Sequence, residues 1–425
     1  MIEKVSLFSS KREVLIFFFI SAFIVIYALL IEYNNYKNLT QFDSALVNAT
    51  ILKQYSKTKT TKSGKLKKYQ VLKLKGERGF SFYSTAKENF PLSVGKKIEL
   101  EIWAGKISFY EYMSSFYAFS KIINADSKFS QKERLNHFIA GQHSDKKIAN
   151  TYQALYTAKP LNAEIQSKFS ALGISHLVAI SGFHLGVLSA LLFFLFKYPY
   201  RFFQNRYFTY RSYKRDSFVV ISLALLSYLL FLDSPPSLLR AFAMLIIGFI
   251  LYDRGIKIIS MLTLLLTVVL LISFFPRLFL SIGFWLSVSG VFYIFLFLIH
   301  FKHLSKLWQF ILIPFWVYIL MLPYSIIIFG NFSIYHPLSI IWTSLFTIFY
   351  PLSIFLHLIN YGDMLDNMLR LLMNLATGDI KIILNWKWLL VQITISLLSI
   401  YKKSFLYLLL SFTLSIFIYS VYHIT

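Results

Sequence analysis

The sequence predicts a polytopic α-helical membrane protein of about nine or ten spans, with a small extracytoplasmic β domain inserted after the first span. Of its 425 residues, 57% are apolar and only 15% are charged, and the formal net charge is +24. Soluble domains carry about 25% charged residues, and disordered chains are poor in apolar residues. With 16 Gly and no Cys, a collagen-like, disulfide-rich or thiolate-metal protein is also excluded.

The first predicted span runs from Val14 to Ile31, between basic Lys11-Arg12 and a polar segment that begins at Glu32. A spanning helix needs about 20 mostly apolar residues, which is close to the length of this segment. No small-residue cleavage pattern follows it. We therefore expect residues 1–31 to be an uncleaved membrane anchor rather than a signal peptide.

Region 32–130 has no convincing span and is predicted to form strands. Residues 98–102 alternate apolar and polar side chains at period two, as a half-buried strand does. Glycines divide the region at strand-like spacing, and five short strands suit a small barrel of the oligonucleotide/oligosaccharide-binding (OB) type. The expected strands are 44–55, 67–75, 79–85, 96–104 and 106–111.

The remainder of the chain is predicted to be helical. Residues 131–170 read as an amphipathic helical connector, and residues 171–425 as a transmembrane bundle of apolar runs broken by short charged or Pro-containing joints. The last two predicted spans are the shortest. The expected spans of the bundle are 177–196, 217–232, 238–252, 258–275, 280–299, 307–329, 337–358, 386–400 and 404–422.

Basic residues in the short joints predict the orientation. With the N-terminus in the cytoplasm, the joint 197–216 and the joints near Lys257 and Lys302 lie inside and carry Lys and Arg, whereas the outer joints 233–236 and 330–336 carry neither. This alternation follows the positive-inside rule. Under the same scheme Lys402-Lys403 falls outside, so the topology of the last two spans stays open.

The segment 172–186 holds the most distinctive polar residues of the bundle. On one helix, His176, Ser181 and His184 would fall within an arc of about 140°. Gly182 and Gly186 form a small-xxx-small pair, which lets two helices approach closely. A stripe that faces water is one interpretation. Histidines that hydrogen-bond across helices and hold the bundle together are the other.

Four segments resemble, in the same order, motifs of the ComEC-type competence proteins. Residues 169–184, FSALGISHLVAISGFH, are similar to the family pattern G-[LI]-S-H-L-[LV]-A-[IV]-S-G-x-H. The segment 237–244, SLLRAFAM, resembles R-A-x-x-M, and 283–288, GFWLSV, resembles G-F-x-L-S. Residues 322–338 match P…F-G-x-x-S…P-L, and the expected outer barrel agrees with the N-terminal region of the family.

The resemblance implies an inner-membrane channel that passes one DNA strand into the cytoplasm of a naturally transformable bacterium. Candidates to line or shape the DNA path are His176, Ser181, His184, Arg240 and Ser287, and Gly182 with Gly186 would provide close helix packing. A guanidinium inside a span is costly in hydrocarbon, so Arg240 is expected to face water, a partner or a passing phosphate. Snorkelling to the membrane surface is the alternative.

Two departures from the family pattern affect these expectations. Ser339 and Ile340 follow Pro337-Leu338, where the family usually has an Asn two residues on. Many members also carry a metallo-β-lactamase-like nuclease domain, and no H-x-H-x-D-H run occurs here. If the strand that is not transported is degraded, a separate protein would have to do it.

Basic residues of the β domain offer a surface for DNA. Residues 53–78 contain ten Lys or Arg and a single acid, Glu77, so a polyanion would bind there in a salt-dependent, sequence-independent way. Aromatic residues nearby are a platform for unstacked bases: Tyr55, Tyr69, Phe80, Phe82 and Tyr83. A solvated hairpin or contact with anionic lipid is the alternative. The candidate DNA-attracting residues are Lys53, Lys57, Lys59, Lys62, Lys65, Lys67 and Lys68.

Two other functions are weighed against DNA transport. An ion- or proton-coupled small-solute transporter usually has Asp or Glu inside its spans, and the acids here, Asp366 among them, fall in joints. An intramembrane hydrolase would use Ser181 and His184, but they lack a third orienting residue. No HExxH occurs either. We expect no enzyme activity, no metal and no cofactor.

The expected partners follow from the transport role. No G-x-x-x-x-G-K-[ST] phosphate loop is present, so the energy source must lie elsewhere. We expect single-stranded DNA, membrane lipid, an extracytoplasmic DNA receptor, a cytoplasmic ATP-driven motor and single-strand-binding proteins as partners. A homo-oligomer is left open.

Overall fold

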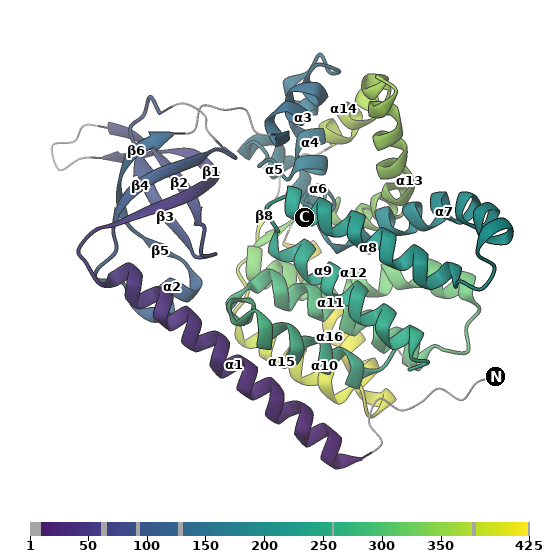
Figure 1. Cartoon of the computed structure of the whole chain (residues 1–425). Helices are drawn as coiled ribbons and strands as arrows, with labels where there is room; N and C mark the ends of the chain where they lie inside the picture. The colour runs from purple at the N-terminus through teal and green to yellow at the C-terminus, as the bar shows by residue number, and fades with distance from the viewer. Residues whose placement is uncertain are drawn as a thin grey trace. The chain divides into compact units, whose positions relative to one another are not determined.

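The computed structural model describes residues 10–60, 66–90, 94–125, 131–256, 259–375 and 380–423. These residues form two compact units (Figure 1). The β unit consists of Ser10–Phe138 and Val269–Ser281, and the helical unit consists of Ile139–Val268 and the chain from Ile282 onward.

The β unit begins with helix α1 (Lys11–Thr40), which extends beyond the predicted end of the anchor at Ile31. At 1.5 Å per residue its 30 residues are about 45 Å long, more than the ~30 Å of a hydrocarbon core. Leu29, Tyr36 and Leu39 pack against the core of the β domain. The second half of α1 is therefore part of that domain, because its apolar side chains are buried there.

An ion pair ties a later segment to the β unit. Glu32 of α1 accepts two hydrogen bonds, at 2.7 and 2.8 Å, from Arg277 of the short 3-10 helix η1 (Pro276–Leu280). The Arg277 guanidinium also lies 4.6 Å from the ring centroid of Tyr112 in helix α2 (Phe109–Ser114). Both charged side chains are less than a fifth exposed, so the pair is shielded from salt.

Six strands form one sheet in the order β5-β3-β2-β1-β4-β6. Strands β5 and β6 lie on either side of Ala118, and they pair with β3 and β4, respectively. This single stretch therefore joins the two ends of the sheet. The strands are β1 (Ala45–Thr60), β2 (Leu66–Gly76), β3 (Ser81–Ala86), β4 (Lys97–Trp103), β5 (Phe116–Tyr117) and β6 (Phe119–Ala125).

Four of the five predicted strands are confirmed with shifted ends, and the fifth, at 106–111, is wrong. That segment enters α2, which begins after a capping box: Ser108 N–H donates to Glu111 at 2.7 Å, and Glu111 N–H donates to Ser108 Oγ at 3.3 Å. The S-x-x-E spacing stabilises a helix start. The last strand pair instead occupies residues 116–125.

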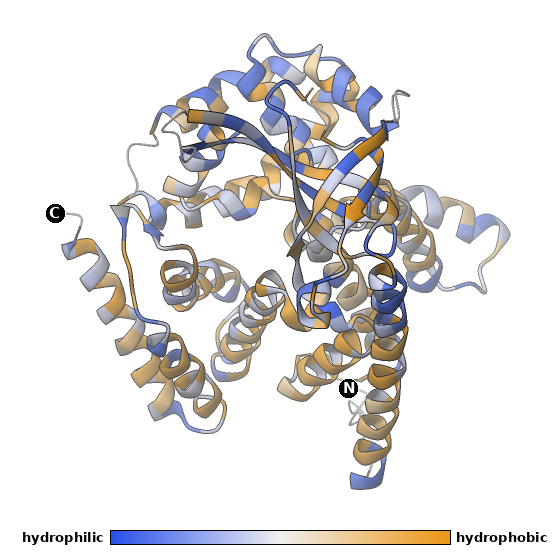
Figure 2. Ribbon diagram, turned by 90° about the vertical axis from the view of Figure 1, so that its left-hand side faces the viewer, coloured by the Kyte–Doolittle hydropathy of each residue, from blue (hydrophilic) through white to orange (hydrophobic). Residues whose placement is uncertain are grey.

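The predicted connector is helical and consists of α3 (Gln131–Ala140), α4 (Lys146–Thr157) and α5 (Ala163–Ala171). Each predicted span except 177–196 coincides with one helix, and Figure 2 shows apolar residues along these helices. In chain order after α5 they are α6 (Ser175–Val178), α7 (Gly182–Tyr207), α8 (Tyr213–Phe231), α9 (Pro236–Asp253), α10 (Met261–Phe274), α11 (Ile282–His300), α12 (Lys306–Phe329), α13 (Ser339–Leu358), α14 (Asp366–Leu375), α15 (Lys387–Leu398) and α16 (Lys403–Tyr422).

The structure thus has the fold class that the sequence predicts: a polytopic helical membrane protein with a small β domain. Within the described residues, six helical segments are long and apolar enough to cross a membrane, fewer than the nine or ten expected. Helices α10 and α15 are apolar but shorter, and α8 starts with three charged residues in its first turn. The six are α1, α7, α11, α12, the segment His336–Leu358 and α16.

A two-stranded ladder changes the predicted topology after α12. Strand β7 (Asn331–Phe332) pairs antiparallel with β8 (Ile380–Lys381), so the chain between them starts and ends at the same place. Among the described residues between these strands, one helix, α13, has membrane length, and α14 has 10 residues. A single crossing by α13 would place β7 and β8 on opposite faces, so their pairing argues against α13 as a crossing.

Hydrogen bonds at both ends of α13 agree with this arrangement. Near its start, a ring nitrogen of His336 lies 2.9 Å from the carbonyl oxygen of Ser170 in α5. Near its end, His357 contacts His143 in the turn before α4, with 3.1 Å between ring nitrogens. Both ends of α13 thus contact the connector helices, which lie on one side of the bundle.

This arrangement of α13 also affects the predicted topology of α15 and α16. The ring of His300, at the end of α11, hydrogen-bonds the carbonyl oxygen of Ser399, just after α15, at 2.9 Å. The joint with Lys402-Lys403 is therefore on the same side as the joint that contains Lys302. The topology of the last two spans, which the sequence left open, then satisfies the positive-inside rule if α13 is not counted as a crossing.

We predict that single cysteines will report this topology, for which the cysteine-free sequence is ideal. Cysteines at the exposed positions Lys302 and Lys402 should react with a membrane-impermeant maleimide only after permeabilisation of whole cells. A cysteine at Ile383, which is 93% exposed beside β8, should react without permeabilisation. Labelling of positions 383 and 402 from the same side would contradict the corrected topology.

Candidate functional site

The most distinctive sequence segment forms a helix break rather than one helix. Helix α6 ends at Val178, Ala179 has an extended backbone (φ −72°, ψ 130°), and Ser181 is the extended N-cap residue of α7. The predicted continuous helix over 177–196, with His176, Ser181 and His184 in one arc, is therefore wrong. The two histidines belong to different helices.

Ser181 and His184 stabilise the start of α7. The Ser181 N–H donates to Nδ1 of His184 at 3.2 Å, and the Ser181 hydroxyl lies 3.2 Å from the same nitrogen. The imidazole thus takes the place that Glu or Gln has in an ordinary capping box. His184 is fully buried, with its ring edge-on to Phe346 and Tyr350 of α13. His176, in contrast, is exposed.

Helix α9 packs directly against the break. The Ser237 hydroxyl donates to the carbonyl oxygen of Ile180 at 2.8 Å, which satisfies a backbone group that the break leaves without a helical partner. A Cβ atom on Gly182 would lie 3.0 Å from Cβ of Ala241, so only glycine allows this approach. Gly182 thus has the close packing expected of it.

Gly186 lacks the helix contact predicted for it. Among the described residues, no atom lies within 4 Å of the position that its Cβ would occupy. Instead Gly186 lines a groove of about 590 Å³ between α7 and α13, together with Ala190, Thr347 and Pro351. The groove is apolar, so it suits hydrocarbon better than a phosphate chain.

Arg240 is buried in protein rather than snorkelling to the surface. It is 5% exposed, and its guanidinium lies 5.7 Å from the ring centroid of Phe284 in α11. Within the described part of the chain, Nε of Arg240 has no hydrogen-bond acceptor and no carboxylate forms an ion pair with it. Half-buried Ser287 follows Phe284 by about one helical turn. The face of α11 next to Arg240 therefore combines an aromatic ring and a hydroxyl.

The fourth resembling segment meets the first at Gly173, which has a left-handed backbone (φ 69°). A Cβ on Gly173 would lie 3.3 Å from His336, which also hydrogen-bonds Ser170. Glycine is favoured at Gly173 because other residues avoid this backbone conformation. All four segments, although distant in the sequence, therefore converge around the helix break.

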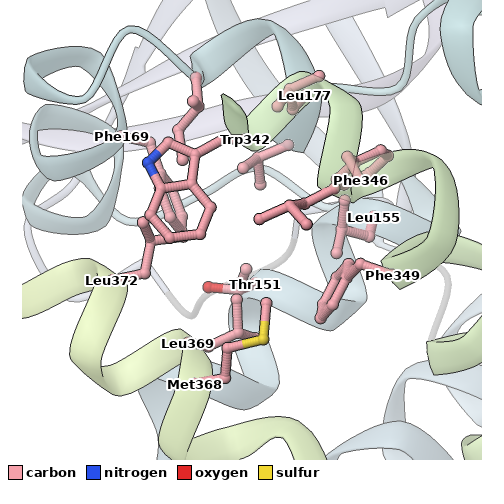
Figure 3. A pocket seen from close by; sticks show the side chains of 13 residues that line it. Thr151, Leu155, Phe169, Leu177, Trp342, Phe346, Phe349, Met368, Leu369 and Leu372 are labelled. Carbon is pink, nitrogen blue, oxygen red and sulfur yellow. The ribbon is translucent and has the colours of Figure 1, made fainter. Parts of the chain in front are cut away.

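The two cavities described in the helical unit are lined mainly by apolar side chains. A second cavity of about 40 Å³ lies among α4, α5, α6, α13 and α14 (Figure 3). Side chains such as Leu177, Phe346 and Met368 converge on it, and the hydroxyl of Thr151 is a rare polar group in its wall. The closed structure thus covers His184 and Arg240, and the predicted DNA path is not open in it.

The lysine-rich surface belongs to strands β1 and β2 of the β unit. Lys53, Lys57, Lys59 and Lys68 are exposed, and Lys53 is opposite Lys73 in the ladder. Like charges at such cross-strand positions repel, so a bound polyanion would relieve the repulsion. Lys67 lies in β2 opposite Lys59 of β1, whereas Lys62 and Lys65 lie outside the described residues.

The aromatic residues near this surface divide into two groups. The ammonium group of Lys57 lies 5.9 Å from the ring centroid of Tyr55, and that of Lys73 lies 5.5 Å from that of Tyr83. Phe80 and Phe82, which were expected to stack on DNA, are 3% and 0% exposed and form part of the core of the β domain. That expectation is wrong for both, because their side chains face inward.

The basic joint between α7 and α8 is partly neutralised. Arg211 pairs with Asp216 at 2.6 Å, and Arg215 pairs with Asp253 at 2.7 Å. These ion pairs give the joint a structural role. Sequence reasoning missed a further polar cluster, His143, His357 and Asp366, because more than 200 positions separate His143 from the other two residues.

We predict that valine substitutions will distinguish the two glycines of α7. Gly182→Val should destabilise the purified protein by about 1–3 kcal/mol, because the new side chain would clash with Ala241. Gly186→Val should change the thermal midpoint little, since it enters open space. Equal losses in both variants would contradict the close contact of α7 with α9 at Gly182.

Comparison with known proteins agrees with the convergence of the four segments. The family model described as "Competence protein" matches residues 157–424, which include the helix break and every segment that meets there. No curated protein and no solved structure matches the chain. The family match covers more than half of the sequence. The chain therefore belongs to the competence protein family, is a multi-pass membrane protein, and has a role in DNA uptake.

Proposed function

We propose that the helical unit provides the path by which one strand of DNA crosses the bacterial cytoplasmic membrane. The observation that carries this proposal is the convergence of four segments at a helix break that holds buried polar side chains. Irregular backbone at membrane depth is tolerated only where protein buries it or where it lines a water-filled cavity. The break therefore marks a place where α7, α9 and α13 can enclose a path.

The closed structure indicates which contacts must separate. Phe346 and Tyr350 of α13 cover the ring of His184, and the face of Phe284 covers Arg240. Movement of α13 away from α7 would uncover His184 and Ser181. Arg240 and Ser287 would then offer a cation and a hydroxyl to the phosphates of a passing strand.

The β unit is proposed to receive DNA as an OB-type barrel. In its strand pairing β1 contacts β2 and β4, β2 contacts β3, and residues 116–125 bridge β3 to β4. This arrangement supports a closed five-stranded barrel. Exposed lysines interleaved with Tyr55 and Tyr83 supply the charge and ring faces that a single strand requires.

The proposed location is the cytoplasmic membrane with the N-terminus inside, and the β unit outside. In this orientation the joints with Lys302 and Lys402 face the cytoplasm, as the positive-inside rule requires. The proposed partners are a DNA receptor outside, and an ATP-driven motor and single-strand-binding proteins inside, because the chain has no phosphate-binding loop of its own.

We propose no catalytic role for Ser181 and His184. Nδ1 of His184 is occupied by both polar groups of Ser181, and no carboxylate orients the ring among the described residues. Coupled transport of a small solute is the second candidate, favoured by the buried pair of His143 and Asp366. Loss of solute uptake together with intact DNA uptake in a deletion strain would select that candidate.

Salt dependence tests the receiving role of the β unit. In the full-length protein, Lys53→Gln, Lys57→Gln and Lys59→Gln together should weaken binding of a labelled single-stranded oligonucleotide. The slope of log K against log salt should decrease by about 0.7 for each lysine, or about 2 in total. Fluorescence anisotropy across a salt series measures both quantities.

The matched control replaces three exposed lysines of the helical unit, Lys302→Gln, Lys402→Gln and Lys403→Gln. These changes remove the same charge and should leave the binding curve unchanged. Binding that is insensitive to salt, or equally weakened by the control, would remove the receiving role from β1 and β2.

Uptake of labelled DNA tests the proposed channel as a whole. A strain that lacks this protein should accumulate label outside the cytoplasmic membrane and none in the cytoplasm, and expression of the unmodified chain should restore entry. Normal cytoplasmic uptake in the deletion strain would refute the proposal.

A further inference from the structure

A buried cluster of titratable side chains lies at the end of α13 that is remote from β7. His143 is in the turn before α4, His357 in the last turn of α13, and Asp366 at the start of α14. The side chain of His143 is 0% exposed, and His357 and Asp366 are 5% and 7% exposed. Tyr152 of α4 stacks on the His143 ring, with centroids 4.6 Å apart.

The three side chains form a continuous chain of hydrogen bonds. Nδ1 of His143 lies 2.9 and 3.1 Å from the two carboxylate oxygens of Asp366. Its Nε2 lies 3.1 Å from Nε2 of His357. Nδ1 of His357 lies 2.7 Å from the carbonyl oxygen of Ser353. Every ring nitrogen of this pair thus faces a specific polar atom.

The neighbours of His357 fix its tautomer. A backbone carbonyl can only accept, so Nδ1 of His357 must carry a hydrogen. The Tyr156 hydroxyl is also near Nδ1, at 3.4 Å, but it donates its own hydrogen to Ser353 Oγ at 2.7 Å. A neutral His357 therefore has no hydrogen on Nε2.

The hydrogens on the ring nitrogens of His143 can be assigned in the same way. If Asp366 is ionised, its oxygens only accept, and Nδ1 of His143 must carry a hydrogen. Two neutral imidazoles would then face each other at Nε2 with lone pairs and no proton between them. The 3.1 Å contact between His143 and His357 requires one additional proton.

The additional proton can be on an imidazole or on the Asp366 carboxyl. Either one imidazole is charged beside an ionised Asp366, or Asp366 is protonated and donates to His143, which donates in turn to His357. Both forms hold the same number of protons and have a net charge of zero, which is favourable for a buried cluster. The three residues therefore titrate as one unit.

The surroundings add few compensating charges. Within the described residues, Asp363 and Arg370 flank Asp366 on its own segment, while Tyr152 and Tyr156 face the cluster from α4. Burial raises the pKa of the Asp366 carboxyl, opposed by the hydrogen bond and charge of His143. Asp363 raises this pKa further, whereas Arg370 lowers it.

We propose that His143, His357 and Asp366 form a proton-binding site whose single shared proton holds the end of α13 and the start of α14 against the turn before α4. Loss of the proton would leave a buried negative charge and two opposed lone pairs. Gln142 reinforces the same contact, since its amide donates to the carbonyl oxygen of His357 at 3.1 Å and accepts from Gly362 N–H at 3.0 Å.

The direction of the pH dependence follows from linkage. In the open state the separated rings need no proton between them, whereas the closed state must hold one there. Closure is therefore favoured near neutral pH and is lost as pH rises through the midpoint of the closed cluster. A one-proton transition changes the ratio of open to closed molecules by about tenfold per pH unit.

The test uses full-length protein in lipid nanodiscs with spin labels at Lys146→Cys in α4 and Leu371→Cys in α14, both exposed positions. Distances between the labels are measured from about pH 6 to pH 10. We expect one short distance near neutral pH and a growing population of longer distances at alkaline pH. A constant distribution across this range would overturn the proposal.

Asp366→Asn is the decisive variant. An amide N–H can donate to Nδ1 of His143, which leaves its Nε2–H to donate to His357, so the hydrogen-bond chain needs no additional proton. The variant should keep the short distance at every pH. Retention of the full alkaline transition in this variant would contradict the shared proton.

Further variants keep the test independent of how Asp366→Asn folds. His357→Gln also removes the need for a shared proton, because its amide can donate to Nε2 of His143, and it should abolish the transition. His300→Gln, which alters a histidine outside the cluster, should retain the transition. Opening caused at neutral pH by a chelator and reversed by Zn²⁺ would show that a metal, rather than a proton, bridges the rings.

Discussion

Backbone polar groups at a helix break inside a membrane bundle need hydrogen-bond partners. The side chains that provide these partners determine how the helices of this unit are arranged. The break between α6 and α7 exposes a carbonyl at Ile180 and an N–H at Ser181. Ser237 satisfies the first and His184 the second. The Ser237 bond requires α9 and α7 to lie in close contact, which Gly182 permits. The polar residues of the family motif thus maintain an irregular backbone at a depth where lipid offers no hydrogen bonds.

Local sequence patterns predict much of this architecture. The features that they did not predict depend on an unusual capping residue or on contacts between distant residues. Apolar runs predicted the helices, and alternation predicted four strands. The helix break was missed because His184 occupies the capping position where Glu or Gln is the usual signal. The role of α13 depends on pairing between β7 and β8, and the proton-binding cluster unites His143 with two residues more than 200 positions later in the chain. Contacts between residues this far apart produce no periodic pattern that a single sequence could show.

Helix α13 connects the features that have functional consequences. Its middle covers His184 with two aromatic rings, its flank lines both described cavities, and its end contributes His357 to the proton-binding cluster. A path wide enough for a nucleotide chain must be sealed at rest, because an open one would dissipate the membrane potential. If the structure is the sealed state of a DNA path, as proposed, the cluster lies on the element that must move to open it.

The passage of DNA beside the helix break can be tested most directly by trapping a strand in transit. Ser181→Cys and Ser287→Cys place single thiols on the proposed path, and Ser415→Cys places one on the exposed face of α16. Incoming DNA with a thiol-reactive group on its backbone should cross-link at positions 181 and 287 during uptake and not at 415. Continued uptake without cross-linking at either path position, or with equal cross-linking at 415, would contradict a DNA path beside the break.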